Sequence, residues 1–239
     1  MAPRDFDIDG LATYLHLTPA QVARMADRGK LPGRRIGGQW RFSEAEIHHW
    51  LEDTIRLSDD EGLEKMETML ERHRQPADVE TITIAQLLPM GAVAVPLIAR
   101  TRNSVIDKMA ELAAGTGLLW DAAKMAAAVR ERENLHPTAL DIGVALLHPR
   151  RPLPNILAEP FLALGRTYQG VPFGGEGGGL TDVFFLICST DDRIHLRTLA
   201  RLSRLLTDAE FLDGIRHAED PAVLHARLAA REQELFGCH

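Results

Sequence analysis

Cysteine is nearly absent from this sequence, and long apolar segments are missing altogether. Only Cys188 and Cys238 occur among 239 residues, the first in an apolar run and the second next to last. This usage favours a reduced, structural Cys188 over a disulfide or a redox pair. No stretch approaches the twenty apolar residues of a membrane span, and the N-terminus has no signal-peptide pattern. We therefore expect a cytoplasmic protein.

Excess positive charge is also lacking, since the formal net charge is -7. This balance argues against a protein coated in nucleic acid. Between residues 19 and 42, however, six of the seven charged residues are basic. A basic cluster on an otherwise acidic chain indicates one surface with a specific binding role. The chain is long enough for two modest domains, and its hydrophobic fraction of 45% is ordinary for a globular protein.

The first fifty residues predict the order helix, turn, helix, wing, helix. Thr18-Pro19 supplies a hydroxyl cap and a proline at the first helical position, with Gln21 at the capping-box position. This second helix should stop at Gly29, where a left-handed conformation is easiest for glycine. Two short strands around Gly37-Gly38 predict a hairpin, and a third helix should follow Ser43.

The second helix and the hairpin carry the residue types that a DNA-binding surface needs. A helix in the major groove requires polar and basic side chains on its exposed face, and a wing requires cations for the phosphates. The alternative is a set of solvated surface charges, while Trp40 should lie in the core. The candidate DNA-binding residues are Gln21, Arg24, Arg28, Arg34, Arg35 and Arg41.

A specific resemblance covers about residues 7–54. The segments Leu11-Ala-Thr-Tyr-Leu-His-Leu-Thr-Pro, Gly29-Lys-Leu-Pro and Arg35-Ile-Gly-Gly-Gln-Trp-Arg-Phe look like the excisionase/MerR-type winged helix-turn-helix module. The resemblance implies DNA binding through the second helix and the wing. Because a single copy of such a module binds weakly, it also implies a homodimer or an array.

The rest of the chain predicts a helical connection and a second domain. Residues 58–74 should form a helix that either packs on a domain or self-associates, and residues 75–78 look like a linker. We expect a winged helix-turn-helix domain at 1–57, a helical linker at 58–78 and a second domain at 79–239. Alternating strands and helices in the last part imply an α/β layer architecture.

Within the second domain, the expected elements alternate along the chain. The glycine-rich loop at 170–179 lacks the strand–glycine–helix context of a phosphate-cradling loop. The expected helices cover 102–114, 118–129 with a break near 130–134, 195–206 and 208 to the end, and the expected strands cover 142–147, 161–164 and 183–187.

His148 is the most informative residue of this domain. It ends an apolar strand-like stretch and is followed by Pro149, Arg150 and Arg151. A phosphohistidine relay needs a neutral, accessible imidazole and cations or N–H groups for the phosphoryl oxygens. Arg132 and His195 are further candidates from elsewhere in the chain. The alternative for a lone histidine is a solvated strand-end residue.

A second resemblance covers about residues 79–235. It rests on three segments: Arg132-Glu-Asn-Leu-His-Pro-Thr138, Gly143-Val-Ala-Leu-Leu-His148 and His195-Leu-Arg-Thr-Leu-Ala-Arg-Leu. They look like the enzyme IIA domain of the fructose/mannitol class, including the nitrogen-regulatory branch, of the sugar phosphotransferase system. The resemblance implies a mixed sheet flanked by helices, with His148 as phosphoacceptor, Arg132 supporting the phosphate and His195 nearby.

One departure concerns the residues that flank the histidine. Leu147 stands where this family commonly has proline, and Pro149 follows the histidine instead. The strand end is therefore expected to present His148 at a different angle. The remaining histidines and carboxylates form no clustered ligand set in sequence, so we expect neither a metal site nor a cofactor.

Two classes of function fit these patterns. The first is a DNA-binding transcription regulator whose enzyme IIA-like domain senses phosphotransferase status, in sugar or nitrogen regulation, through phosphorylation of His148. The second is a phosphocarrier that passes phosphate from a histidine phosphocarrier protein to a IIB partner. A degenerate IIA fold used for protein contacts is the third, weaker reading. The basic face favours the regulator, because a plain carrier does not need one.

Overall fold

The computed structural model describes residues 5–15, 17–58, 60–71, 83–175 and 177–237. The chain divides into two compact units, Met1–Val79 and Glu80–His239, and each is described here by itself. Helix α4 (Asp60–Glu71) belongs to the first unit. The end of the helix expected at 58–74 and the linker expected at 75–78 lie outside the described residues.

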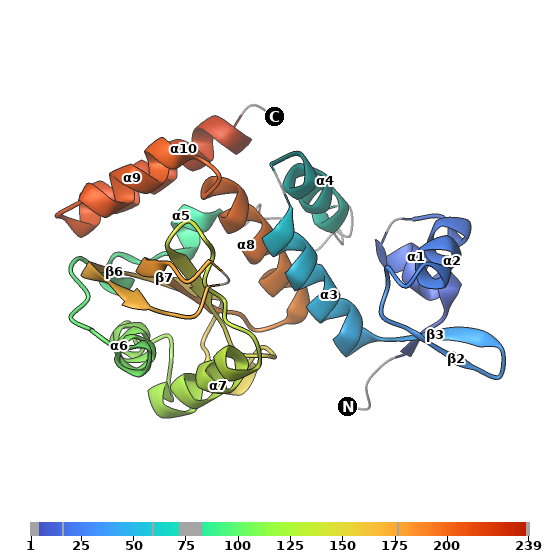
Figure 1. Ribbon diagram of the computed structural model, residues 1–239. Coiled ribbons are helices and arrows are strands. Elements are labelled where there is room, and N and C mark those ends of the chain that lie inside the picture. Colours follow the sequence, from blue (N-terminus) through green and yellow to red (C-terminus); the bar gives the residue numbers. More distant parts are fainter. Residues whose placement is uncertain (1–4, 16, 59, 72–82, 176, 238–239) are drawn as a thin grey trace. The chain divides into compact units, whose positions relative to one another are not determined.

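The first unit combines helices with a small antiparallel sheet of order β1-β3-β2 (Figure 1). Its core is formed by apolar side chains such as Leu11, Val22, Phe42 and Ile47, all fully buried. Strand β1 was not expected from the sequence; it adds two residues to the far side of β3. The elements are β1 (Asp5–Phe6), α1 (Ile8–Leu15), α2 (Pro19–Asp27), β2 (Arg34–Ile36), β3 (Gln39–Ser43), α3 (Glu44–Leu57) and α4.

Most local signals of the first fifty residues are confirmed, although Ser43 stands at the N-cap of α3 without a side-chain cap hydrogen bond. Thr18 caps α2 by accepting the Gln21 N–H, and the Gln21 side-chain oxygen accepts the Thr18 N–H at 2.8 Å. Gly29 adopts a positive φ of 68° just beyond the helix. In the hairpin Ile36 pairs with Gln39, so the turn consists of Gly37 and Gly38, both with positive φ.

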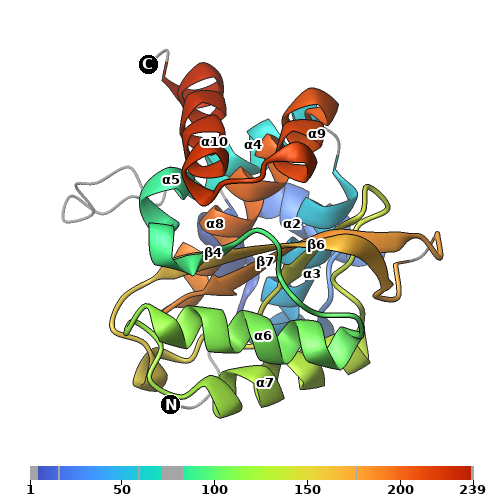
Figure 2. The ribbon, with the colours of Figure 1, turned by 90° about the vertical axis from the view of Figure 1, so that its left-hand side faces the viewer.

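The second unit is a mixed sheet with helices on both faces, as the resemblance implied. Figure 2 shows α6 and α7 below the sheet and α5, α8, α9 and α10 above it. The helices and 3-10 turns are α5 (Ile84–Leu87), η1 (Met90–Ala92), α6 (Arg102–Gly115), α7 (Ala122–Leu135), η2 (Pro154–Ile156), α8 (Asp192–Leu205), α9 (Ala209–His217) and α10 (Pro221–Phe236). The strands are β4 (Val93–Ala94), β5 (Val144–Leu147), β6 (Phe161–Pro172) and β7 (Leu180–Cys188).

The sheet order is β4-β6-β7-β5, with β5 at one edge. Strands β5 and β7 are parallel, with Leu147 opposite Leu186, so their carboxyl ends lie at the same end of the sheet. Beside β5, the segment after α7 runs antiparallel through the bridge between Ala139 and Ala145. His148 and the start of α8 both follow this carboxyl end, which positions the candidate site.

Several expected boundaries are wrong. Strand β6 continues to Pro172, well beyond the expected 161–164 and into the loop expected at 170–179, and β4 was not expected. Helix α7 does not break near residues 130–134 but continues to Leu135, because Arg130 pairs with Asp107 of α6 and Glu133 is buried. The single helix expected from residue 208 to the end divides into α9 and α10. The division falls where Asp220 and Pro221 start a new helix.

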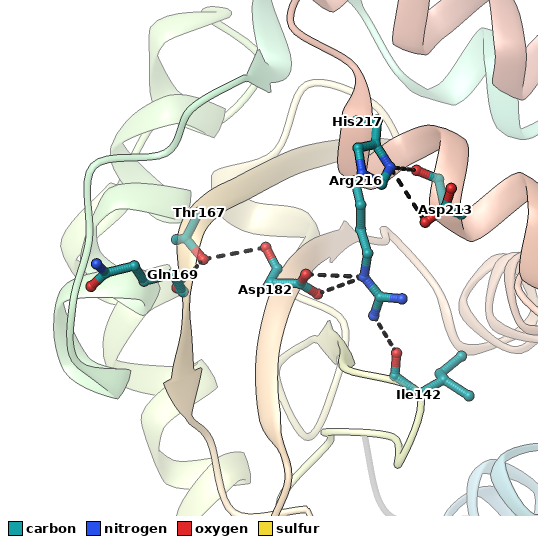
Figure 3. Close-up of polar contacts among 7 residues, drawn as sticks. All are labelled: Ile142, Thr167, Gln169, Asp182, Asp213, Arg216 and His217. Carbon is teal, nitrogen blue, oxygen red and sulfur yellow. Dashed lines mark hydrogen bonds and ion pairs between the residues drawn. The ribbon is translucent and has the colours of Figure 1, made fainter.

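Helix α9 is joined to the amino end of the sheet by Arg216 (Figure 3). Its guanidinium donates to both carboxylate oxygens of Asp182, at 3.1 and 2.9 Å, and to the Ile142 carbonyl at 2.5 Å. Thr167 of β6 donates to the Asp182 carbonyl at 3.3 Å. This cluster lies at the opposite end of β7 from His148, so we assign it a structural role in holding α9 against the sheet.

Cys188 ends β7 inside the core and forms no disulfide. Burial raises the pKa of its thiol far above the usual range, so the group stays protonated and inert at neutral pH. Cys238 lies outside the described residues.

Candidate functional site

His148 directly follows the last residue of β5. Its Nδ1 lies 2.7 Å from the carbonyl oxygen of Leu146. A carbonyl oxygen can only accept, so Nδ1 must carry the proton and Nε2 must carry the lone pair of the neutral ring. The accessible position expected for this imidazole is wrong, because His148 is 0% exposed. Within the second unit, His195 of α8 lies against the ring where the sequence suggested an open strand end.

His195 lies beside His148. It belongs to the first turns of α8, which Asp191 caps by accepting the Ile194 N–H at 2.8 Å. The centroids of the two imidazole rings are 4.8 Å apart, with an angle of 50° between the planes. Two residues 47 positions apart in sequence thus form one imidazole pair at the carboxyl end of the parallel strands.

Arg132 and Glu133 occupy the last turn of α7, and both are buried. The Arg132 guanidinium donates to the His136 carbonyl at 2.7 Å, which closes the end of the helix. The Glu133 carboxylate accepts the Thr138 N–H at 3.2 Å and the Thr138 hydroxyl. Thr138 in turn joins β5, because its carbonyl accepts the Leu146 N–H at 3.3 Å. The Arg132 segment is therefore connected to the residue whose carbonyl holds His148.

Burial raises the pKa of the Glu133 carboxyl above its usual value. The hydrogen bonds from Thr138 and the charges of Arg102 and Arg132 oppose this rise. Arg102 of α6 approaches the carboxylate to 3.6 Å. Arg132 was predicted as a site residue from this motif, whereas Glu133 and Thr138 were not. A carboxylate on the inward face of a helix, five residues before a threonine, was the available signal.

The two arginines after His148 differ from the expectation of a local phosphate clamp. Arg150 is exposed. The Arg151 guanidinium pairs with Asp192 of α8 at 3.0 Å. Arg151 thus connects the loop after β5 to the start of the helix that carries His195, which supports the imidazole pair from outside.

In the first unit, the cations of α2 are arranged differently from those of the wing. Within the described residues, Arg24, Arg28 and Lys30 make no ion pair. They line one open hollow together with Leu17, Gln21 and Met25. The Gln21 oxygen is occupied by the helix cap, which leaves its amide N–H₂ group for other contacts.

The wing arginines each meet an aspartate of the same unit. Arg34 pairs with Asp5 at 3.4 Å, and Arg41 pairs with Asp7 at 3.8 Å. The third pair brings Arg35 to 2.9 Å from Asp27, the last residue of α2.

Trp40 was expected in the core, but it is only half-buried, and Phe42 fills the core instead. The half-buried Trp40 indole donates to Asp27 at 3.1 Å and stacks under Arg35. The position opposite Arg35 in the hairpin explains the difference, because the indole N–H finds an acceptor in Asp27 there.

Comparison with known proteins defines the class of both parts. Residues 6–54 match the helix-turn-helix domain family. Residues 86–230 match the family described as phosphoenolpyruvate-dependent sugar phosphotransferase system, EIIA 2. The chain belongs to this EIIA family and carries a helix-turn-helix domain at its N-terminus. Among the described residues, none of the helices is long and apolar enough to cross a membrane.

Relatives of known name agree with this class. A nitrogen regulatory protein of Bradyrhizobium diazoefficiens is 31% identical over 101 residues, which are 41% of this chain and 64% of that protein. The chain thus spans a little under two thirds of that relative's length. A fructose-specific EIIA component of Haloferax volcanii is 23% identical over 64% of this chain and 95% of its own.

Solved structures show the same fold at low identity. The nitrogen regulatory protein IIA-Ntr of Neisseria meningitidis superposes with a TM-score of 0.55 and 19% identity, over 61% of this chain and 98% of its own. IIA mannitol of Escherichia coli gives 0.52 and 18%, over 59% and 97%.

Proposed function

We propose that this protein is a DNA-binding transcription regulator whose EIIA-type domain senses phosphotransferase status by phosphorylation of His148. The observation that carries the proposal is the imidazole pair. The Leu146 carbonyl holds the proton on Nδ1 of His148, which leaves Nε2 as the nucleophile. His195 is adjacent to receive or share charge as the phosphoryl group arrives.

The chemistry is transfer between two histidines. Nε2 of His148 attacks the phosphorus of a phosphohistidine on a histidine phosphocarrier protein. The donor's N–P bond breaks as the new one forms, and the donor keeps the electron pair. Arg132 is our candidate for stabilising the charge on the phosphoryl oxygens. Because His148 is buried, transfer requires that the donor gain access to Nε2.

The signal would be read out by DNA binding. Arg24 of α2 and Arg28 and Lys30, which follow the helix, line one hollow, and within the described residues they have no carboxylate partner. Such cations suit the major groove and its phosphates. Gln21 and the wing residues Arg34, Arg35 and Arg41 complete the proposed interface, and a homodimer would present two copies of it. A phosphoryl group adds about two negative charges, enough to shift a domain or dimer contact.

Labelling with phosphoenolpyruvate and the purified general phosphotransferase proteins tests this proposal. Wild-type protein should acquire one phosphoryl group, and His148→Ala should acquire none. His217→Ala is the matched control, because this exposed histidine pairs with Asp213 on α9 (Figure 3). An unlabelled wild type, or labelled His148→Ala, would overturn the proposal and favour a IIA fold used only for protein contacts.

A second measurement separates the regulator from a plain phosphocarrier. Phosphorylated and unphosphorylated protein are titrated against a random-sequence duplex library at low salt. A regulator should bind, with an affinity that changes on phosphorylation. Phosphoryl transfer to a IIB protein with no DNA binding in either state would establish the carrier function instead.

A further inference from the structure

Glu133 is the most enclosed charged group near the candidate site, with its side chain 0% exposed. Its carboxylate contacts three groups: the Thr138 backbone N–H, the Thr138 hydroxyl and the Arg102 guanidinium. Both oxygens lie 3.2 Å from the Thr138 backbone nitrogen, and one accepts the Thr138 hydroxyl. Arg102 balances its charge from α6 at 3.6 Å. A single carboxylate therefore fixes both the backbone and the side chain of Thr138.

Thr138 transmits this constraint to β5. Its carbonyl accepts the Leu146 N–H at 3.3 Å, and the bridge between Ala139 and Ala145 continues the pairing. The carbonyl of the same Leu146 accepts from Nδ1 of His148 at 2.7 Å. Leu146 is thus held at its N–H by the segment that Glu133 fixes, and its C=O holds the imidazole.

We propose that Glu133 and Thr138 are positioning residues that fix the tautomer and orientation of His148 for phosphoryl transfer. They touch neither the phosphoryl group nor the imidazole, and they act through the Leu146 backbone. The inference rests on the proposed function for its reaction, while the tautomer itself is a property of the free protein. It extends the site to residues on the opposite side of β5 from β7.

The tautomer matters because only one nitrogen of a neutral imidazole is nucleophilic. With the proton on Nδ1, the Nε2 lone pair attacks phosphorus, and the Leu146 carbonyl stabilises the positive charge that develops on the ring. If the Leu146 carbonyl shifts, the proton can occupy Nε2 and the ring presents no lone pair there. Displacements of about 1 Å can lower a rate by up to about 100-fold.

A matched pair of substitutions at Thr138 tests the inference. Thr138→Val keeps the shape and removes the hydroxyl that Glu133 accepts, whereas Thr138→Ser keeps the hydroxyl. Glu133→Gln removes the charge, and Glu131→Gln is its control on the exposed side of α7. The measurements are the tautomer of His148 by long-range ¹H–¹⁵N correlation spectra, the rate of labelling from the phosphocarrier, and thermal unfolding.

In wild type we expect the tautomer with the proton on Nδ1. Thr138→Val and Glu133→Gln should give a mixture of tautomers and labelling about tenfold slower. Thr138→Ser and Glu131→Gln should behave as wild type. Should Glu133→Gln fail to fold, the Val and Ser pair still decides the question.

The two proposals fail separately. Folded Thr138→Val with an unchanged tautomer and labelling rate would overturn the positioning role and leave phosphorylation of His148 standing. A purely structural role would lower the unfolding temperature without moving the tautomer. A wild type that no donor labels, but whose tautomer responds to Thr138→Val, would support the positioning role and overturn the proposed function.

Discussion

The two units use their charged residues in opposite ways. In the first unit the wing arginines remain well exposed although each pairs with an aspartate; the side chains of Arg34 and Arg35 are 62% and 61% exposed. The second unit has exposed pairs too, but it also encloses one: Arg201 and Glu232 pair at 3.0 Å with side chains 8% and 5% exposed. Exposed pairs contribute little to stability, about 0–1 kcal/mol, and can exchange partners. Buried pairs hold elements in place, because a lone buried charge is strongly destabilising.

The largest effect is expected from Glu232→Ala in the second unit. Glu232 of α10 accepts the N–H groups of Ile84 and Ala85 at 2.6 and 2.9 Å, and it neutralises Arg201. Removal should destabilise the unit by about 3–5 kcal/mol, since it leaves Arg201 buried without this carboxylate. Urea unfolding measures the change, with the exposed Glu234→Ala as control. A loss below about 1 kcal/mol would contradict the importance given to buried pairs.

Arg24→Ala combined with Arg28→Ala should have the next largest effect, on DNA binding. Losing two cations without carboxylate partners should weaken binding at low salt about 100-fold. The slope of log affinity against log salt should become about two units shallower, because two fewer counterions are released. Fluorescence anisotropy with a random-sequence duplex measures both.

The matched control for that pair is Arg34→Ala combined with Arg41→Ala. These wing arginines also lose contacts to Asp5 and Asp7, so a smaller change is expected. Equal losses in the two double variants would remove the distinction between α2 and the wing.

A pH dependence is expected at Glu133. Because burial raises the pKa of its carboxyl above the usual 4.5, the folded protein holds this proton more tightly than the unfolded chain. Its contribution to stability is therefore full below the usual value and is lost as the pH rises through the raised pKa. As the pH rises above the usual value of 4.5, wild type should lose stability relative to Glu133→Gln. Urea midpoints of both proteins test this, and the opposite slope would contradict a raised pKa.

The smallest effect is expected from Asp5→Asn in the first unit. The pair with Arg34 is long, at 3.4 Å, and both side chains are more than one third exposed. Its loss should change the free energy of unfolding by less than about 1 kcal/mol. It should leave Arg34 available and keep or slightly strengthen DNA binding at low salt. A large loss of stability would show that the wing depends on its ion pairs.

Much of the first unit could be predicted from local sequence. The Thr18 cap, Gly29 and the Gly37-Gly38 turn depend on interactions within a few residues, so they can be predicted from residues that are neighbours in the sequence. Trp40 was misplaced because its partner, Asp27, lies on another element. Strand β1 escaped prediction for the same reason: two residues carry no periodicity, and their pairing with β3 is a tertiary event.

In the second unit the sequence pointed to three of the four strands, without β4 and without the second half of β6, and not to their surroundings. It predicted that Arg132 and His195 belong with His148. The structure pairs the rings of His148 and His195, while the proximity of Arg132 to the phosphoryl group stays a prediction. The contact of His148 with His195 and the pairing of Arg151 with Asp192 depend on how α8 packs at the strand ends. Spacing along the chain carries no information on either.

The sequence by itself determined the class of both parts: a helix-turn-helix domain with a basic second helix, and an EIIA domain with a histidine at the end of a strand. Caps, turns and apolar periodicity are local, and they suffice for elements and for family. Only the tertiary structure decided which charges remain exposed on α2 and which are enclosed. It also decided that a series of hydrogen bonds connects Glu133 through Thr138 and Leu146 to His148. Hydrogen bonds across β5 join segments from α7 to the strand end, and such contacts exist only once the chain has folded.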